Sequence, residues 1–241
     1  MSNFVMAQSL EQALEVLAGG GVKVIAGGTD LMIHLRKCRL SGAQAPETIL
    51  DVSRLEELKR LEPGGDEPYI GAGLTFRSLE NDPEIASNLP LLAQAASSVG
   101  SVQVRQTATI GGNVAQNAGG PRCLKYGVTV DYVLSLEVVL PSGEVIRFGS
   151  RNVKDVTGYR LSSLFCGSEG TLGIVTEITL RVVPLPEAVR TILAVYSDLD
   201  ATAATVADII GSGILPAALE LMDKTVVNAV EDSAAIGLPR H

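Results

Sequence analysis

The sequence of 241 residues predicts an α+β fold, and three patterns lead to this prediction. The first forty residues alternate between helix, strand, glycine-rich turn and helix. Two apolar segments, 132–140 and 144–148, flank Pro141–Ser142–Gly143 and predict a β-hairpin. Residues 173–183 alternate apolar and polar side chains, as a half-buried strand does, and Pro184 and Pro186 close that strand.

The N-terminal half carries local signals for its helices and strands. Ser9 and Gln12 have the spacing of a capping box, apolar residues then recur at helical spacing, and Gly19–Gly21 end the helix. Three strands are also expected in this half, at 22–26, 48–52 and 69–72. Two further helices are expected: one begins over 31–35, and the other spans 89–99.

The C-terminal part reads as an incomplete α+β unit after the boundary at Pro184 and Pro186. A strand at 191–196, a helix at 201–210 and a strand at 217–222 predict a βαβ-like arrangement, followed by a loose tail. This length is too short for a complete α+β domain, so we expect an unpaired sheet edge there.

Composition excludes several classes of function. The net charge is −8 with no run of Lys or Arg, which argues against nucleic acid or anionic lipid as a partner. Aromatic residues make up 4% and Trp is absent, so base-stacking surfaces are not expected. An anionic cofactor would therefore be neutralised mainly by backbone N–H groups.

Location and redox state are also expected from the sequence. The N-terminus lacks the features of a signal peptide and no apolar stretch is long enough to insert into a membrane, which predicts a soluble cytoplasmic protein. The cysteines, Cys38, Cys123 and Cys166, have no CxxC spacing and are expected to be reduced thiols. They are too scattered to hold an iron–sulfur cluster by themselves.

The segment AGGTDL, residues 26–31, lies between a predicted strand and a predicted helix. Paired glycines allow successive N–H groups to converge on an anion, and the following helix adds its positive end. The Thr29 hydroxyl is a further donor. The alternative is a plain turn in which Thr29 or Asp30 caps the helix. Neither GxGxxG nor GxxxxGK[ST] is present, so Rossmann and P-loop sites are not supported.

Two further glycine-rich segments follow the same logic. TIGGN, residues 109–113, is followed by Asn117–Ala118–Gly119–Gly120, and together with AGGTDL it could clamp a diphosphate from both sides. GSEGTLGIVTE, residues 167–177, leads into a strand, and its alternative interpretation is a hairpin entry with a solvated Glu169.

Together these residues resemble the FAD-binding domain of the vanillyl-alcohol oxidase and p-cresol methylhydroxylase (PCMH/VAO) superfamily. Residues 1–113 resemble the FAD-binding (medium) subunit of xanthine and carbon monoxide dehydrogenases, through AGGTDL, ETILDVSRLEEL, YIGAGLTFRSLE, LPLLAQAASSVGSVQVR and TIGGN. From residue 109 onward the chain resembles the FAD subunit of glycolate oxidase and D-lactate dehydrogenases, through NVAQNAGGPRCLKYGVTVDYVLSLEVVLPSGEV, VKDVTGYRL, LFCGSEGTLGIVTEITLRVVPLP and GILPAALELMD. The seam of this hybrid lies near 105–120, where both branches have a TIGGN-like turn.

The resemblance implies a two-lobed FAD-binding domain over residues 1–185, with lobe one at about 1–60 and lobe two at about 61–185. A partial segment similar to the cap of FAD-linked oxidases would follow at 186–241. Non-covalent FAD is expected, because the glycine motifs contain no His and only Cys123 as a thiol. Cys123 as a flavin tether is the alternative, and a buried thiol is the ordinary case.

The resemblance also implies which residues contact FAD. Those expected at the diphosphate are Ala26, Gly27, Gly28, Thr29, Asp30 and Leu31 on one side, and Thr109, Ile110, Gly111, Gly112 and Asn113 on the other. Those expected near the flavin are Asn117, Ala118, Gly119 and Gly120. Those expected to give backbone contacts along the cofactor are Gly167, Ser168, Gly173, Ile174 and Val175, with Gly71 and Thr75 as weaker candidates.

No catalytic base stands out in the sequence. Oxidation of a 2-hydroxy acid needs a base near the hydroxyl and cations for the carboxylate. His34 lies on a predicted helix and His241 is the last residue, so neither is a strong candidate. Side chains able to bind a carboxylate, each equally explained as a solvated charge, are Arg122, Lys125 and Lys154. No metal site is expected.

Three functional hypotheses follow. The first is a flavoprotein similar to glycolate or D-lactate dehydrogenase, acting on a small-molecule substrate. The second is an electron-transfer subunit of a molybdenum hydroxylase, in a hetero-oligomer with an iron–sulfur protein. The third is a chimera or fragment that binds FAD without catalytic activity.

Overall fold

Two units make up the chain in the computed structural model, which describes residues 2–65, 68–152, 154–184 and 186–240. The first unit comprises residues 1–118 and 129–182, and the second comprises 119–128 and 183–241. Helices and strands both contribute, and the α+β prediction is confirmed. The domain and lobe boundaries given above stay predictions.

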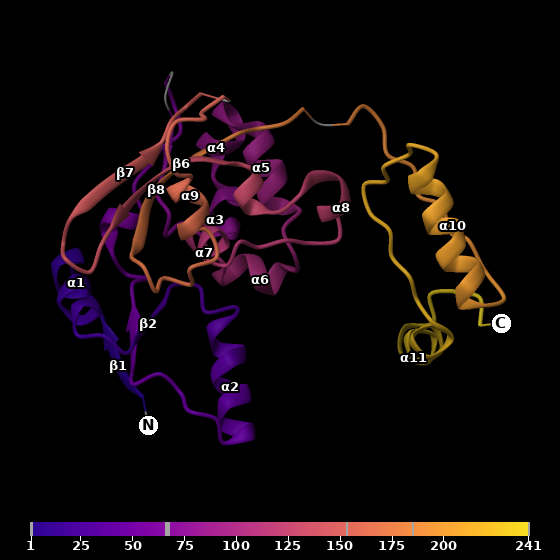
Figure 1. The fold of residues 1–241 in the computed structure, drawn as a ribbon, viewed down its shortest axis with the longest axis horizontal. Coiled ribbons are helices and arrows are strands. Elements are labelled where there is room, and N and C mark those ends of the chain that lie inside the picture. Colours follow the sequence, from indigo (N-terminus) through magenta and orange to yellow (C-terminus); the bar gives the residue numbers. More distant parts are fainter. Residues whose placement is uncertain (1, 66–67, 153, 185, 241) are drawn as a thin grey trace. The chain divides into compact units, whose positions relative to one another are not determined.

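A parallel sheet opens the first unit (Figure 1). Its strands are β1 (Asn3–Met6), β2 (Val22–Ile25) and β3 (Thr48–Asp51), in the order β1-β3-β2. The connecting helices are α1 (Leu10–Ala18) and α2 (Leu31–Ser41). Because the strands are parallel, the segments that follow them, AGGTDL among them, leave the sheet at one edge.

The capping signal before α1 is confirmed. The Ser9 hydroxyl accepts a hydrogen bond from the Gln12 amide at 3.2 Å, and the Gln12 side chain accepts one from the Gln8 amide at 2.7 Å. The reciprocal bond thus reaches one residue further back than in a standard capping box. Strand β1 was not predicted, because four residues are too few to establish a period.

Short elements fill the middle of the first unit. The strands β4 (Leu61–Glu62) and β5 (Tyr69–Ile70) pair antiparallel, and a 3-10 helix spans Glu56–Leu58. The helices here are α3 (Phe76–Asn81), α4 (Pro83–Asn88), α5 (Pro90–Ser97) and α6 (Val102–Thr107). The predicted helix at 89–99 corresponds to α5, whereas α3, α4 and α6 span six residues each and show too little periodicity to be predicted.

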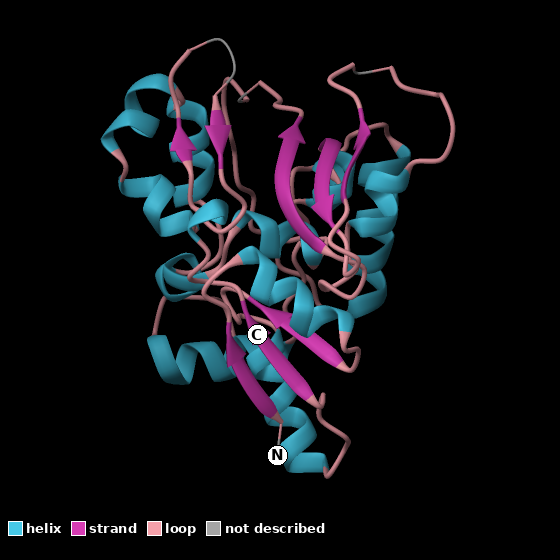
Figure 2. Ribbon diagram, turned by 90° about the vertical axis from the view of Figure 1, so that its left-hand side faces the viewer, coloured by secondary structure: helices cyan, strands magenta, loops and turns pink. Residues whose placement is uncertain are grey.

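An antiparallel sheet completes the first unit. Its strands are β6 (Val133–Val139), β7 (Val145–Gly149) and β8 (Ile174–Leu180), in the order β7-β6-β8. The predicted hairpin is β6–β7, and the predicted strand at 173–183 is β8. The helices α7 (Ile110–Ala115) and α9 (Leu161–Phe165) and a 3-10 helix (Thr129–Asp131) accompany this sheet. Figure 2 shows the separate groups of strands.

Buried side chains form three clusters in the first unit, and β8 contributes to two of them. Ile174 lies in the cluster of the parallel sheet with Leu50 and Leu55, whereas Val175 lies in the cluster of the antiparallel sheet with Val114 and Leu136. The third cluster joins α3, α4 and α5. Neighbouring side chains of a strand point to opposite faces, so β8 links the cores of both sheets.

The second unit is helical in the structure. It contains α8 (Cys123–Tyr126), α10 (Leu199–Gly211) and α11 (Lys224–Ala234). The predicted helix at 201–210 is confirmed as α10. The prediction of a loose tail was wrong over residues 224–234, which form α11. Asp223 caps this helix by accepting from the Val226 amide at 2.7 Å.

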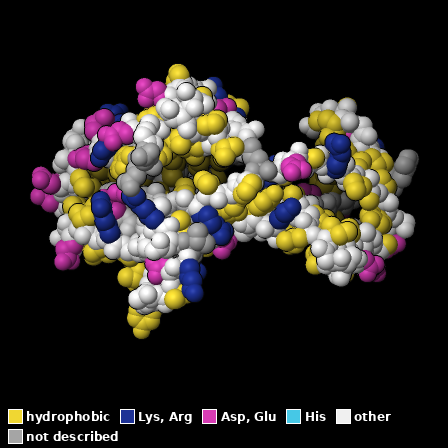
Figure 3. All heavy atoms as spheres, turned by 90° about the horizontal axis from the view of Figure 1, so that it is seen from above, with side chains coloured by type: hydrophobic (Ala, Val, Ile, Leu, Met, Phe, Trp, Pro, Cys, Tyr) yellow, Lys and Arg dark blue, Asp and Glu magenta, His cyan; other side chains and the backbone are white. Residues whose placement is uncertain are grey.

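The strands predicted at 191–196 and 217–222, and with them the βαβ-like unit, were wrong. Both segments are irregular and pair with no described segment of the unit. Apolar side chains there are exposed, including Ile192 and Leu193, and Figure 3 shows hydrophobic side chains on the surface of both units. An apolar alternation forms a strand only where a neighbouring strand supplies hydrogen bonds.

Among the helices of the described ranges, none has the length and apolar character needed to span a bilayer.

Leu50 on the central strand β3 tests the first core. Its side chain is fully buried, so Leu50→Ala should lower the free energy of unfolding by about 3 kcal/mol, through lost apolar burial and the cavity left behind. Leu40→Ala, at an exposed leucine on α2, should change it by less than about 0.5 kcal/mol. Urea unfolding monitored by circular dichroism measures both. Equal losses would contradict the packing described.

Candidate functional site

The segment AGGTDL leads into the N-terminus of α2, where the backbone amides are not capped. It follows β2 directly, and Gly28 has a left-handed backbone (φ +72°) that favours glycine. The first bonds of α2 are from the Met32 amide to the Gly28 carbonyl and from the His34 amide to the Asp30 carbonyl. Within the described ranges, the N–H groups of residues 27–31 have no acceptor.

Side chains do not cap this helix start. Asp30 makes no capping hydrogen bond, and its carboxylate accepts instead from the Thr29 hydroxyl at 2.9 Å. Asp30 thus stands at the N-cap position, but neither its side chain nor that of Thr29 caps the helix by a hydrogen bond. The segment leaves a run of amide donors at the positive end of an 11-residue helix, which is the chemistry of an anion site.

TIGGN has a different role in the backbone. The predicted glycine turn is the start of α7, where the Thr109 hydroxyl accepts from the Gly112 amide at 3.0 Å. The Ile110 amide donates to the Leu74 carbonyl and the Gly111 amide donates to the Ala72 carbonyl. These N–H groups are bonded inside the protein, so the expectation of two equivalent amide nests was wrong.

The two glycine segments nevertheless lie side by side. A Cβ atom built on Gly27 would stand 2.0 Å from the Thr107 carbonyl oxygen and 2.9 Å from the Ala108 Cα atom. Only glycine allows this approach. AGGTDL therefore packs directly against the two residues that precede Thr109.

GSEGTLG contacts α7 and the strand that precedes AGGTDL. The Gly167 amide donates to the Val114 carbonyl and the Glu169 amide donates to the Ala115 carbonyl, so this loop lies on the end of α7. A Cβ on Gly170 would stand 2.9 Å from the Val24 Cβ atom of β2. The three glycine segments predicted from the sequence thus converge in the first unit.

Other predicted contact residues have internal partners. The Asn113 side chain donates to the Thr129 hydroxyl, and the Asn117 side chain accepts from the Val130 amide, both at 2.8 Å. The Ala118 carbonyl accepts from the Thr129 hydroxyl. These bonds fix the turn after α7. Gly119 and Gly120 belong to the second unit.

The remaining predicted contacts lie in packed backbone. A Cβ on Gly173 would stand 2.7 Å from Val138 Cγ1, and Ile174 and Val175 are buried. Ser168 donates its amide to the Phe165 carbonyl and accepts from the Thr171 hydroxyl. Of the weaker candidates, Gly71 packs against Leu58 and Thr75 caps α3.

Arg105, which our sequence analysis did not single out, holds the segment beside Gly27. It is buried, its Nε atom pairs with Glu80 at 3.0 Å, and it donates to the carbonyls of Val99 and Gly100. The guanidinium of Arg77, and then that of Arg105, lower the pKa of the Glu80 carboxyl.

Candidate chemical groups outside the glycine segments have ordinary surroundings. His34 contacts Cys38 at 3.4 Å, and burial raises the pKa of the Cys166 thiol. Cys123 accepts from the Gly120 amide at 3.0 Å. The candidate carboxylate-binding side chains, those of Arg122, Lys125 and Lys154, are exposed. His241 lies outside the described residues, within which no cluster of His, Cys, Asp or Glu suits a metal ion.

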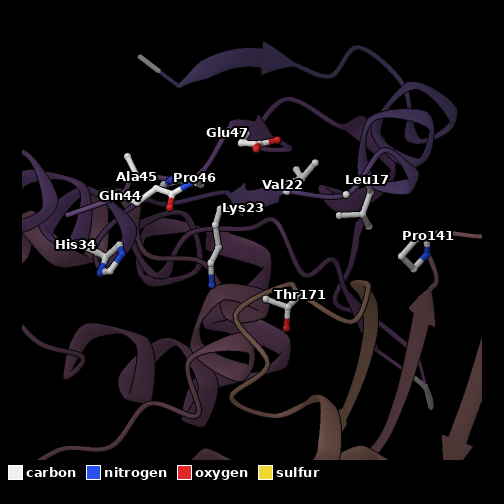
Figure 4. A pocket seen from close by; sticks show the side chains of 12 residues that line it. Leu17, Val22, Lys23, His34, Gln44, Ala45, Pro46, Glu47, Pro141 and Thr171 are labelled. Carbon is white, nitrogen blue, oxygen red and sulfur yellow. The ribbon is translucent and has the colours of Figure 1, made fainter.

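A cavity of about 620 Å³ opens beside β2 (Figure 4). It is lined by Val22 and Lys23, by His34 of α2, by residues 44–47, and by Pro141 and Thr171. Its polar side chains come from different elements and carry both signs of charge. The cavity borders the start of β2, whereas AGGTDL follows the end of this strand.

Comparisons with known proteins agree with this geometry. Residues 1–218 match the family described as FAD binding domain in molybdopterin dehydrogenase. The chain is 57% identical over 131 residues to glycolate oxidase subunit GlcD of Bacillus subtilis, covering 54% of this chain and 28% of that protein. It is 49% identical over 124 residues to D-lactate dehydrogenase of Anaerostipes hadrus, covering 52% of this chain and 26% of that protein.

The fold is also found in a solved structure. Quinoline 2-oxidoreductase from Pseudomonas putida 86 aligns with a TM-score of 0.55 and 21% identity, over 78% of this chain and 60% of that one. The family match and the sequence relatives confirm both branches of the resemblance, whereas the position of the seam stays a prediction. The chain spans only about a quarter of the two sequence relatives.

Gly27 tests the contact between the first two glycine segments. Gly27→Ala should lower the free energy of unfolding by about 2 kcal/mol, because the new methyl group overlaps the Thr107 carbonyl. Gly64→Ala is the control, since nothing lies within 4 Å of its added Cβ. Urea unfolding compares them. Equal stability of the two variants would mean that the segments are further apart than described.

Proposed function

Because the chain belongs to the family of FAD binding domains in molybdopterin dehydrogenases, we propose that the amides of residues 27–31 bind the diphosphate of FAD. The single observation that supports this assignment is the run of N–H groups without a described acceptor at the start of α2. Glycines at 27 and 28 leave the backbone accessible, and the helix adds its positive end.

The chemistry of the donors suits this cofactor. The chain has a net charge of −8 and no basic cluster that could surround a diphosphate with side-chain cations. Backbone N–H dipoles can bind the diphosphate without such cations. We further propose that segments of the same unit, Thr109–Asn113, Asn117–Ala118 and Gly167–Val175, shape the cofactor site. Non-covalent binding is part of the proposal.

For the reaction, we propose a flavoprotein oxidoreductase acting on a 2-hydroxy acid. The support is the identity to a glycolate oxidase subunit and to a D-lactate dehydrogenase. When bound, FAD supplies an acceptor for a hydride. This chain's own residues bind and orient the cofactor. The described glycine segments contain no histidine, so the proposal assigns no catalytic base to them.

A second candidate is an electron-transfer subunit. It is favoured by the family description, which names molybdopterin dehydrogenases. In that case the chain would sit in a hetero-oligomer and exchange electrons with an iron–sulfur protein. The third hypothesis, FAD binding without catalysis, shares the same cofactor site. The cytoplasmic location stays a prediction.

Gly28 tests the cofactor site. Gly28→Val should reduce FAD affinity by at least about tenfold, because a branched side chain at positive φ disturbs the backbone that presents the amides. Gly42→Val is the matched control, with a similar φ of +73° at the opposite end of α2. Fluorescence titration with FAD measures affinity, and thermal unfolding measures stability. Retention of FAD by Gly28→Val would refute the assignment.

The nature of the reductant separates the three hypotheses. Anaerobic addition of glycolate or D-lactate should bleach the oxidised flavin band of the FAD-loaded protein if the first is correct. Bleaching by NADH alone would support the electron-transfer subunit instead. A flavin that responds to none of the three would support the inactive chimera. Absorbance spectroscopy records each outcome.

A further inference from the structure

One ion pair connects the parallel sheet to the glycine loop before β8. Lys23 Nζ lies 3.0 Å from Glu169 Oε2, between residues 146 positions apart in the sequence. We propose that Lys23 and Glu169 are positioning residues that hold the loop 167–171 against β2 and so keep the FAD site assembled. This inference rests on the proposed function of AGGTDL. It gives the side chains of Lys23 and Glu169 a structural role in the FAD site, which a solvated charge would not have.

The backbone at Glu169 is unusual for a glutamate. Its φ of +52° is left-handed, and the flanking Gly167 and Gly170 have φ of +83° and +71°. Glycine would adopt this conformation without strain, whereas a residue with a Cβ does so at a cost. The Glu169 side chain therefore supplies something that glycine would not, and in the structure this is the bond to Lys23.

Lys23 stands where the loop meets the sheet. β2 is an edge strand, and Gly170 packs so closely that a Cβ there would lie 2.9 Å from Val24. The Lys23 side chain points from β2 toward the segment that carries Thr171 (Figure 4). A lysine on an edge strand is commonly only a guard against aggregation. Here it has a defined partner on the loop.

The strand β2 connects the ion pair to the amide donors. Along β2 the side chains of Lys23 and Ile25 lie on the same side of the strand, because side chains alternate. Ile25 in turn reaches the next turn, since its Cδ1 atom lies 3.1 Å from a Cβ built on Gly28. A loop that moves away from Lys23 would therefore loosen the strand that carries AGGTDL.

The side chains of Lys23 and Glu169 are 29% and 53% exposed, so their attraction is screened by salt. At low ionic strength, Lys23→Met and Glu169→Gln should each weaken FAD binding about two- to fivefold, the range of a partly exposed ion pair. The double variant Lys23→Glu with Glu169→Lys should recover most of the affinity. The effect of each single variant should shrink at high salt.

Lys59→Met is the control. It removes a pair of similar length, 3.1 Å to Glu56, that stays within one local turn and touches no glycine segment. Its FAD affinity should equal that of the parent. Fluorescence titration gives the dissociation constants at two salt concentrations, and thermal unfolding of each variant without FAD shows whether the fold is retained.

The outcomes distinguish this inference from the proposed function. Single variants that bind FAD like the parent, or a charge swap as weak as the single variants, would overturn the positioning role. If Gly28→Val loses FAD in the same experiment, the function of AGGTDL still stands. A parent protein that binds no FAD would overturn both.

Discussion

The site depends on one close approach between two stretches of backbone. Gly27 packs against the Thr107 carbonyl and Ala108 at distances that exclude any side chain. This contact places AGGTDL beside the start of α7, although the segments are some eighty positions apart in sequence. Arg105 holds the second stretch by binding Glu80 and the carbonyls of the two residues Val99 and Gly100, which follow α5. Without this contact, the unbonded amides before α2 would have no second backbone segment beside them.

The antiparallel sheet contributes by anchoring the third glycine segment. β8 places Ile174 in one core and Val175 in the other, so the loop that precedes it is fixed to both sheets. That loop then bonds to the end of α7 through Gly167 and Glu169 and lies against Val24 through Gly170. Among these contacts, Gly173, a predicted cofactor contact, also packs closely against Val138 of β6.

Sequence patterns predicted the elements that carry their own local signals. Ser9 with Gln12, the hairpin around Pro141–Gly143 and the alternation of β8 all specify structure within a few residues. The strands expected at 191–196 and 217–222 failed because strand formation needs a partner, which the sequence of one segment does not reveal. For the site, glycine pairs located the converging segments. They did not show that the amides of Ile110 and Gly111 are bonded to Leu74 and Ala72.

An anion site built from peptide groups constrains the path of the main chain and leaves most nearby side chains free to vary. Substitutions can therefore accumulate around AGGTDL provided that Gly27 and Gly28 persist. A turn of this kind tolerates change in the side chains around it, because the positive φ of Gly28 and the close approach at Gly27 restrict only those two positions to glycine.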